Sequence, residues 1–308
     1  MSNKKKLFQL AVSLVILTVL FFSIDLDELS KININSSIYI IFGIFGMLFL
    51  SIGTRALRWQ IIYNSQAYDL KFSFWSSFRY VLIGSALNII TPAGSGDVLK
   101  SYYIFKDTGA KESAIAVSLF DKLVAIASIG FLGIYAYGQT LSPIYLSAAV
   151  ISPIPLIVME MGVLFREKSF LQAVINFIAR KIKRLDFHQL LEFMSFSLKT
   201  KTVSLAISLC GWIATYILLF LCFILVGSEQ LTIENALVEG SILTLGRLFP
   251  FTFSGLGSDE AIMIFLFQKY QITSAIILSG ALIYRLILIF VPAMAGLVII
   301  QKKAIGKT

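Results

Sequence analysis

The sequence is short of cysteine and histidine, the residues on which disulfide frameworks and many metal sites depend. Its two cysteines, Cys210 and Cys222, lie inside one apolar run and offer neither a disulfide framework nor a metal-ligand cluster. Its single histidine, His188, lies in a basic loop without a second histidine or a nearby cysteine. No nucleotide-binding fingerprint is present either. We therefore expect no metal and no cofactor.

Charged residues are also scarce, whereas apolar residues are abundant. Of 308 residues, 14% are charged and 57% hydrophobic, which leaves too little polar surface for a soluble domain of this length. The net charge is +9, but the lysines and arginines cluster at the ends of apolar runs and in one loop. This distribution is typical of membrane orientation. We expect a multi-pass protein of the inner or plasma membrane, without a nucleic-acid partner.

Six apolar runs are long enough to cross a hydrocarbon core of ~30 Å. They are Leu7–Ile24, Ile38–Thr54, Ala114–Tyr137, Ser142–Leu164, Val203–Val226 and Thr273–Ile300. The first run resembles a signal peptide, but no small-x-small cleavage site follows it, so we interpret it as a retained helix. The sequence therefore predicts an all-α polytopic membrane protein.

Two further apolar regions are interrupted by turns rich in proline and glycine. One covers 74–90, is interrupted at 91–97 and resumes over 98–105; the other covers 236–249, is interrupted at 250–260 and resumes over 261–267. The second limb of each region is too short to cross a bilayer. We interpret both as re-entrant helical hairpins, which enter and leave the membrane on the same side. The chain then forms one domain, residues 1–308, with eight hydrophobic segments.

The positions of lysine and arginine support this topology, because short cytoplasmic loops favour them. With the amino terminus inside and both hairpins re-entrant, the outer loops retain only Lys31 and Lys269. Converting one hairpin into a crossing would place every later basic loop outside. Converting both would place the eight basic residues between Arg166 and Lys201 outside. We therefore expect both termini to be cytoplasmic.

The two broken regions resemble each other in the order of their residues. In the first, Gly84-Ser85, Pro92 and Gly96-Asp97 precede Lys122, which lies 25 residues after Asp97. The counterparts in the second are Gly240-Ser241, Pro250, Gly257, Glu260 and Arg285, the last again 25 residues after the acid. Because the hairpins enter from opposite sides, units at about 37–137 and 203–300 are predicted to be inverted repeats, as in alternating-access carriers.

Carboxylates at the two breaks are expected at membrane depth, where an ionised group needs a partner. We expect Asp97 to pair with Lys122, and Glu260 with Arg285. Such pairs either only hold each hairpin to the next helix or also contact an anionic headgroup during passage, for which the planar fork of arginine is well suited. Asp121 points to a different side of its helix from Lys122. It faces either the polar interior or the membrane surface.

Glycines at the breaks serve as turn residues or free backbone amides that bind anions. The candidate substrate-translocation residues are Asn88, Pro92, Gly96, Asp97, Lys100, Asp121, Lys122, Arg247, Pro250, Gly255, Gly257, Asp259, Glu260 and Arg285.

Residues 166–202 mix apolar and basic side chains at helical spacing. This predicts an amphipathic helix on the anionic cytoplasmic leaflet, with a solvated basic loop as the alternative. Arg55, Arg58 and Trp59 are expected at the same surface, where they would end the second span. The expected membrane-surface anion contacts are Arg55, Arg58, Arg180, Lys181, Lys183 and Arg184.

Several of these residues form an ordered set: Arg55-x-x-Arg58-Trp59, Asn88 with Pro92 and Gly96-Asp97, Gly255-Leu-Gly257-x-x-Glu260, and Arg285. This set resembles the transmembrane domain family of lysylphosphatidylglycerol synthases and their stand-alone, flippase-like relatives. The resemblance covers nearly the whole chain. It implies a lipid flippase fold that moves aminoacylated phospholipids in the fused proteins, and polyprenyl-linked or other glycolipids in the stand-alone ones. Lipid- or glycan-synthesis enzymes are the partners that it suggests.

The departures from the family pattern are concentrated in the first unit. Where the family commonly has Pro-x-Arg-x-Gly-Glu, this chain has Pro92-Ala-Gly94-Ser-Gly96-Asp97, and Lys100 and Lys122 replace the usual arginines. We therefore expect the second hairpin, with Glu260 and Arg285, to be the better anion site. The soluble aminoacyltransferase domain of the full synthases is not in this sequence, so synthesis of lysyl-lipid is not expected.

We expect a membrane lipid translocase that moves an anionic phospholipid, an aminoacyl-lipid or a polyprenyl-linked glycolipid between leaflets. A membrane-embedded transferase, with Asp97 or the Asp259-Glu260 pair as base, is a competing hypothesis. It is disfavoured because neither a close-spaced carboxylate cluster for a divalent metal nor a nucleophile with an adjacent base is present. A carrier of soluble solutes and a non-catalytic partner of a glycan-assembly complex are two further hypotheses.

Overall fold

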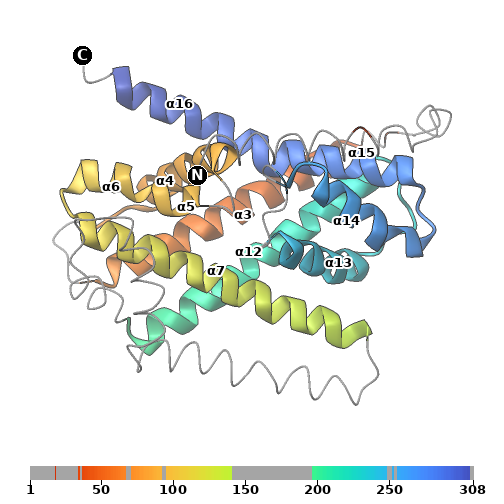
Figure 1. Cartoon of the computed structure of the whole chain (residues 1–308), viewed down its shortest axis with the longest axis horizontal. Helices are drawn as coiled ribbons and strands as arrows, with labels where there is room; N and C mark the ends of the chain where they lie inside the picture. The colour runs from red at the N-terminus through yellow and green to blue at the C-terminus, as the bar shows by residue number, and fades with distance from the viewer. Residues whose placement is uncertain are drawn as a thin grey trace.

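The computed structural model describes residues 18, 34, 37–66, 71–91, 95–140, 196–247, 252 and 255–305. Every regular element in these ranges is helical, which confirms the predicted all-α fold class. Long helices run along the greatest dimension of the molecule, and shorter helices gather toward its two ends (Figure 1).

Four helices in the described ranges are long and apolar enough to cross a membrane. They are α3 (Ile38–Asn64), α7 (Lys111–Thr140), α12 (Leu198–Leu225) and the continuous helix of α15 (Ser274–Arg285), η4 (Leu286–Phe290) and α16 (Val291–Ile305). They match four of the six predicted spans. The runs at 7–24 and 142–164 fall outside the described residues except for Thr18, as does the basic segment before 196.

All four helices extend beyond their predicted bounds at one end or both, and the longest extensions are those of α3 and α12. The side chain of Ser197 caps α12 by accepting a hydrogen bond from the Thr200 amide, so the helix begins five residues before the predicted Val203. The helix α3 continues ten residues past the predicted end at Thr54, through a stretch of lower hydropathy whose backbone remains helical.

The extension of α3 corrects the prediction that Arg58 and Trp59 lie at the membrane surface. Both side chains are buried inside the helix bundle. Trp59 stacks on Tyr63, with ring centroids 5.3 Å apart, and meets Phe72 edge-on at 5.4 Å. Helical spacing turns this part of α3 toward the protein interior, so the surface assignment of Arg58 and Trp59 is wrong.

Both broken regions consist of short helices. In the first, α4 (Phe74–Ile90) is followed by α5 (Gly96–Leu99) and α6 (Ser101–Thr108). In the second, α13 (Ile233–Gly246) is followed by α14 (Ser258–Phe267) and η3 (Gln268–Tyr270). The longest of these helices, α4, has 17 residues. Each is therefore shorter than the roughly 20 residues that a spanning helix needs. Pro92 and Pro250 lie outside the described residues.

The helices α3 to α7 form the first half of the described structure, and α12 to α16 form the second half. The two halves pack against each other reciprocally. The helices α3 and α12 cross at the centre, while α4, α5 and α6 lie toward one end and α13 and α14 toward the other (Figure 1). The helix α16, at the end of the second half, packs along α4 of the first half. In the same way, α7 of the first half packs along α13 of the second.

Small and hydroxyl residues allow α3 and α12 to approach closely. The hydroxyl groups of Ser51 and Thr215 are 2.7 Å apart across the helix pair. A Cβ atom on Gly211 would lie 2.5 Å from the Thr54 hydroxyl oxygen, so a larger residue here would require the Thr54 side chain to move. Close contact at small residues and hydroxyl hydrogen bonds stabilise helix pairs in membranes, where water does not drive association.

Large apolar side chains cover the outer faces of the spanning helices. On α3 these include Tyr39, Phe42 and Phe45, and on the α15–α16 helix they include Met294 and Val298. An exposed apolar surface of this extent is unfavourable in water but is suited to contact with lipid.

Candidate functional site

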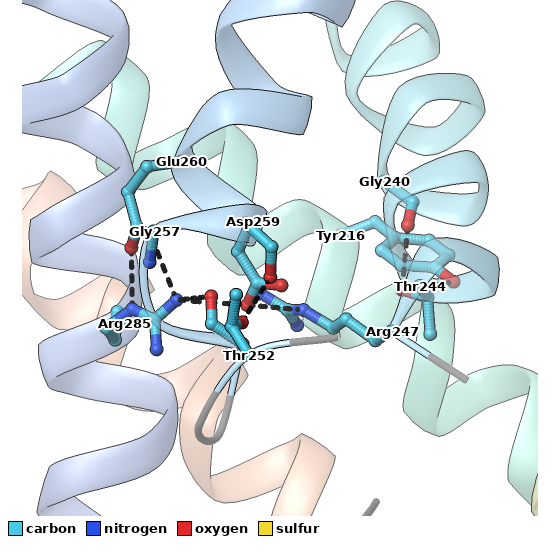
Figure 2. A network of polar contacts seen from close by, with 11 residues as sticks. Tyr216, Gly240, Thr244, Arg247, Thr252, Gly257, Asp259, Glu260 and Arg285 are labelled. Atoms are coloured by element: carbon cyan, nitrogen blue, oxygen red, sulfur yellow. Dashed lines mark hydrogen bonds and ion pairs between the residues drawn. The ribbon is translucent and has the colours of Figure 1, made fainter. Parts of the chain in front are cut away.

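Arg285 holds the second broken region together at its tip. It lies in the last turn of α15 and donates from Nε to Glu260 Oε1 at 2.6 Å. Its Nη2 is 3.1 Å from both Glu260 Oε2 and Asp259 Oδ2, and 2.7 Å from the carbonyl oxygen of Gly255 (Figure 2). The predicted pair of Glu260 with Arg285 is therefore present. The guanidinium binds three groups of one loop at once.

The loop geometry explains why glycines occupy this tip. Gly255 and Gly257 have φ angles of 74° and 83°, a region that side chains with a Cβ rarely adopt. A Cβ on Gly255 would also lie 2.7 Å from the carboxylate oxygens of Asp259. The Gly257 amide donates to Glu260 Oε2 at 2.7 Å, which satisfies an amide at the start of α14. Glu260 thus neutralises Arg285 and caps its own helix.

Arg247 closes the same cluster from the end of α13. Its Nε donates to Asp259 Oδ2 at 2.9 Å, and its guanidinium lies over the Tyr284 ring, 5.6 Å from the centroid. One turn before Arg247, Thr244 accepts a hydrogen bond from Tyr216 of α12 at 3.2 Å (Figure 2). We define Arg247, Asp259, Glu260 and Arg285 as the second cluster. It joins α13, α14 and α15.

At the first break, Asp97 binds two cations from different spanning helices. Its Oδ1 accepts from Arg55 Nη2 of α3 at 3.0 Å, and its Oδ2 lies 3.5 Å from Lys122 Nζ of α7. The predicted pair of Asp97 with Lys122 is therefore present. Arg55, expected as a membrane-surface contact, is partly exposed and has its guanidinium on this carboxylate.

Asp121 anchors a second, more deeply buried part of the same region. Its Oδ1 accepts from Arg58 Nε at 2.7 Å, and its Oδ2 lies 3.4 Å from Lys100 Nζ. Arg58 also donates from Nη1 to Ser208 of α12 at 2.6 Å. Asp121 therefore faces the polar interior, one of its two predicted orientations. We define Arg55, Arg58, Asp97, Lys100, Asp121 and Lys122 as the first cluster.

Glycines bring the limbs of the first region into contact. A Cβ on Gly84 of α4 would lie 3.3 Å from both Asp97 Oδ1 and Lys100 Cδ. A Cβ on Gly96 would lie 2.4 Å from the backbone nitrogen of Asn88. The predicted residues Asn88, Gly96 and Asp97 therefore meet at one point.

Glu239 is a buried acid that the sequence analysis missed. It lies in the middle of α13 and is fully buried. Its Oε1 accepts from the Tyr270 hydroxyl at 2.7 Å and lies 2.5 Å from Lys269 Nζ, so it joins the two limbs of the second region. A lone carboxylate within an apolar segment needs a partner, and this was the available signal.

Several predicted site residues are not placed by the structure. Pro92, Pro250 and the four basic residues Arg180, Lys181, Lys183 and Arg184 fall outside the described ranges. Among the residues that are described, no group of three or more histidine, cysteine, aspartate or glutamate side chains is arranged to hold a metal ion.

The sequence similarity to known proteins extends over both clusters. Residues 6–296 match the family described as the lysylphosphatidylglycerol synthase TM region. The chain is also similar to the UPF0104 membrane protein MJ1595 of Methanocaldococcus jannaschii, with 24% identity over 334 residues that cover 98% of this chain and 97% of that protein. The chain therefore belongs to the family of the lysylphosphatidylglycerol synthase TM region.

Proposed function

We propose that the protein is a lipid translocase that moves a phosphate-bearing lipid between membrane leaflets. The observation that carries this proposal is the pair of buried ion clusters at the two broken helices, inside a bundle with an apolar outer surface. Buried charges in membrane helices are costly and mark pathways for polar groups. A headgroup can cross along these charges while its acyl chains remain in lipid.

The reciprocal packing supports an arrangement of inverted repeats. The units 37–137 and 203–300 show matching contacts: α3 with α4 and α12 with α13, α5 with α7 and α14 with α15, and α4 with α16 and α13 with α7. Such repeats place a binding site between broken helices and alternate its access by moving one unit against the other. The short limbs of both broken regions favour re-entrant hairpins over crossings.

The distribution of charge supports an orientation with the first hairpin on the cytoplasmic side. The end of α3, all of α6, the start of α12 and the end of α16 lie at one end of the molecule (Figure 1). The basic residues of that end are Lys71, Lys106, Lys111, Lys199, Lys201, Lys302 and Lys303. The opposite end carries Glu229, Glu234 and Lys269. Basic residues favour cytoplasmic loops, so this end of the molecule, with the end of α16, is assigned to the cytoplasm. If the apolar run at 7–24 crosses the membrane, as the sequence predicts, the amino terminus lies on the same side.

Transfer of a fluorescent phosphatidylglycerol in liposomes tests the function. A membrane-impermeant reductant added outside destroys only the label in the outer leaflet of protein-free vesicles. With the protein present, we expect the label of both leaflets to be lost, and heat-unfolded protein to have no effect. Protection of the inner leaflet at every protein density would refute the proposal. Chemical conversion of the lipid, detected by mass spectrometry, would favour the transferase instead.

Cysteine labelling tests the orientation separately. In a background with Cys210 and Cys222 replaced by serine, Gln230→Cys is expected to react with an impermeant maleimide in intact cells. Lys71→Cys is expected to react only after the membrane is opened. The reverse pattern would invert the assigned topology.

A further inference from the structure

The two clusters differ in their balance of charge. The first contains four cations, Arg55, Arg58, Lys100 and Lys122, and two carboxylates, Asp97 and Asp121, so its formal charge is +2 among the described residues. The second contains two cations, Arg247 and Arg285, and two carboxylates, Asp259 and Glu260, so its formal charge is zero.

Both carboxylates of the second cluster have a cationic partner within the protein. These carboxylates and Arg285 are almost fully buried, with side-chain exposures of 4%, 1% and 6% for Asp259, Glu260 and Arg285. The Arg285 donors are directed at the carboxylates and at a backbone carbonyl of the same loop. Arg247, the fourth member, is 21% exposed and is bound to Asp259. A neutral cluster whose carboxylates are all paired stabilises the loop and attracts a further anion less than a cluster with excess positive charge does.

The first cluster has more positive charge than its own carboxylates neutralise. Each carboxylate is shared by two cations, one at each oxygen: Asp97 by Arg55 and Lys122, and Asp121 by Arg58 and Lys100. The net positive charge of these described side chains produces a local potential that attracts an anion. A phosphodiester supplies about one negative charge, and a monoester about two.

The excess charge lies partly at an accessible surface. The inner cations Arg58 and Lys100 have side-chain exposures of 6% and 1%, whereas Arg55 and Lys122 have 33% and 28%. Among the described residues, Arg55 donates a single hydrogen bond, from Nη2 to Asp97. The rest of its five donors are arranged as a planar fork that matches phosphate oxygens.

We propose that the first cluster, not the second, binds the phosphate group of the lipid, with Arg55 and Lys122 as the contacting residues. The inner Arg58, Lys100 and Asp121 maintain the positive potential behind them. The identification of the ligand as a lipid rests on the proposed function. It reverses the expectation drawn from Glu260 and Arg285, because matching a family pattern does not show whether a cation is already neutralised.

A binding experiment tests this assignment without requiring transport. The full chain is purified in detergent and titrated with dihexanoyl phosphatidylglycerol, using dihexanoylglycerol as the phosphate-free probe. We expect only the first probe to bind. The Arg55→Gln/Lys122→Gln variant is expected to raise the Kd about tenfold or more, because it removes charge-assisted hydrogen bonds. Arg55→Lys retains the charge without the fork and is expected to give an intermediate Kd.

The controls separate the first cluster from the second and from general charge loss. Arg79→Gln removes an exposed arginine of α4, and Arg247→Gln removes a cation from the second cluster. Both are expected to leave the Kd within about twofold, since neither contributes to the site. Unchanged affinity in the Arg55/Lys122 variant, or a tenfold loss in Arg247→Gln alone, would overturn the assignment. Thermal unfolding of each variant verifies that it is folded.

Inorganic phosphate distinguishes the two sources of the ligand. If the lipid headgroup is recognised, phosphate at the same concentration does not displace the short-chain lipid. Equal competition would assign the site to free phosphate and overturn its lipid identity. If the unchanged protein fails to transfer lipid between leaflets, but the Arg55/Lys122 variant still loses binding, translocation is refuted and the anion site is retained. If the unchanged protein transfers lipid, but the Arg55/Lys122 variant binds with unchanged affinity, the anion site is refuted and translocation is retained.

Discussion

Gly96 lies against the backbone of Asn88 so closely that a Cβ on Gly96 would be 2.4 Å from the Asn88 nitrogen. The contact joins the start of α5 to the last part of α4 and holds Asp97 beside its cations. Since the obstructing atoms belong to a helix backbone, no side-chain rotation relieves the clash.

Gly96→Ala is therefore expected to force α5 away from α4. Overpacking of this kind typically costs about 1–3 kcal/mol, so we expect a clear fall in the melting temperature of the purified protein. Binding of the short-chain phosphatidylglycerol should weaken as well, because Asp97 moves with α5.

Gly46→Ala is the matched control, because Gly46 lies in a spanning helix with no atom within 4 Å of the added Cβ. We expect its melting temperature to equal or exceed that of the unchanged protein. Equal melting temperatures for the two alanine variants and the unchanged protein would show that α4 and α5 are not in this close contact.

Asp121→Asn is expected to be severely destabilising. Asp121 is the carboxylate that neutralises Arg58 and Lys100, and all three side chains are buried. Removing one partner of a buried ion pair costs about 3–5 kcal/mol, because the remaining charge is uncompensated. The yield of monodisperse protein and its melting temperature measure this effect.

Combining Asp121→Asn with Lys100→Met distinguishes electrostatics from a loss of packing. The second change removes one of the two stranded cations while retaining an unbranched side chain. We expect the double variant to recover part of the lost stability. A double variant less stable than Asp121→Asn alone would show that the Lys100 stem, and not its charge, matters most.

Tyr270, in the second broken region, gives a prediction with a pH dependence. Tyr270 donates to the buried Glu239 at 2.7 Å, and Tyr270→Phe removes that donor. Hydrogen bonds to charged groups contribute about 1.5–3 kcal/mol, so the variant should melt at a lower temperature. Tyr39→Phe, at an exposed tyrosine of α3, is the matched control and should not change the melting temperature.

Burial, together with the adjacent Glu239, raises the pKa of Tyr270. A raised pKa means that the fold favours the neutral phenol. The stabilisation is therefore fully present below the ordinary tyrosine value of about 10, and it is lost as the pH rises through the higher folded value. The difference in melting temperature between the protein and Tyr270→Phe should stay constant from neutral pH to about pH 10. A difference that already disappears near neutral pH would exclude this hydrogen bond as its cause.

Much of the described structure was predictable from two features of the sequence. One is its hydropathy, and the other is the requirement that a buried charge has a partner. The four described spans lie where their apolar runs indicated, and α4 begins and ends at the predicted Phe74 and Ile90. The pairs of Asp97 with Lys122 and of Glu260 with Arg285 were also predictable. Each unites an acid at a helix break with a base 25 residues later, on the next long helix.

The contacts of Arg58 could not be predicted in the same way. Its partners, Asp121 and Ser208, lie 63 and 150 residues away, and their contact depends on how three helices are rotated in the bundle. Hydropathy ended the second span at the first arginine, whereas backbone hydrogen bonding continues to Asn64. Glu239 was overlooked for a related reason, since Tyr270 and Lys269 reach it only through the packing of the second broken region.

Arg285→Ala tests the structural role assigned to the second cluster. Glu260 is paired only with Arg285 among the described cations, whereas Asp259 also contacts Arg247. The variant therefore leaves Glu260 as a buried charge without a cation, which costs about 3–5 kcal/mol. Adding Glu260→Gln should restore part of the melting temperature, and Arg285→Lys should lie between the two, since it keeps the charge but not the fork. Arg79→Ala, at an exposed arginine, should have no effect on melting. If Arg285→Ala instead melts like the unchanged protein but no longer binds phosphatidylglycerol, the second cluster is an anion site and the division of roles between the two clusters is wrong.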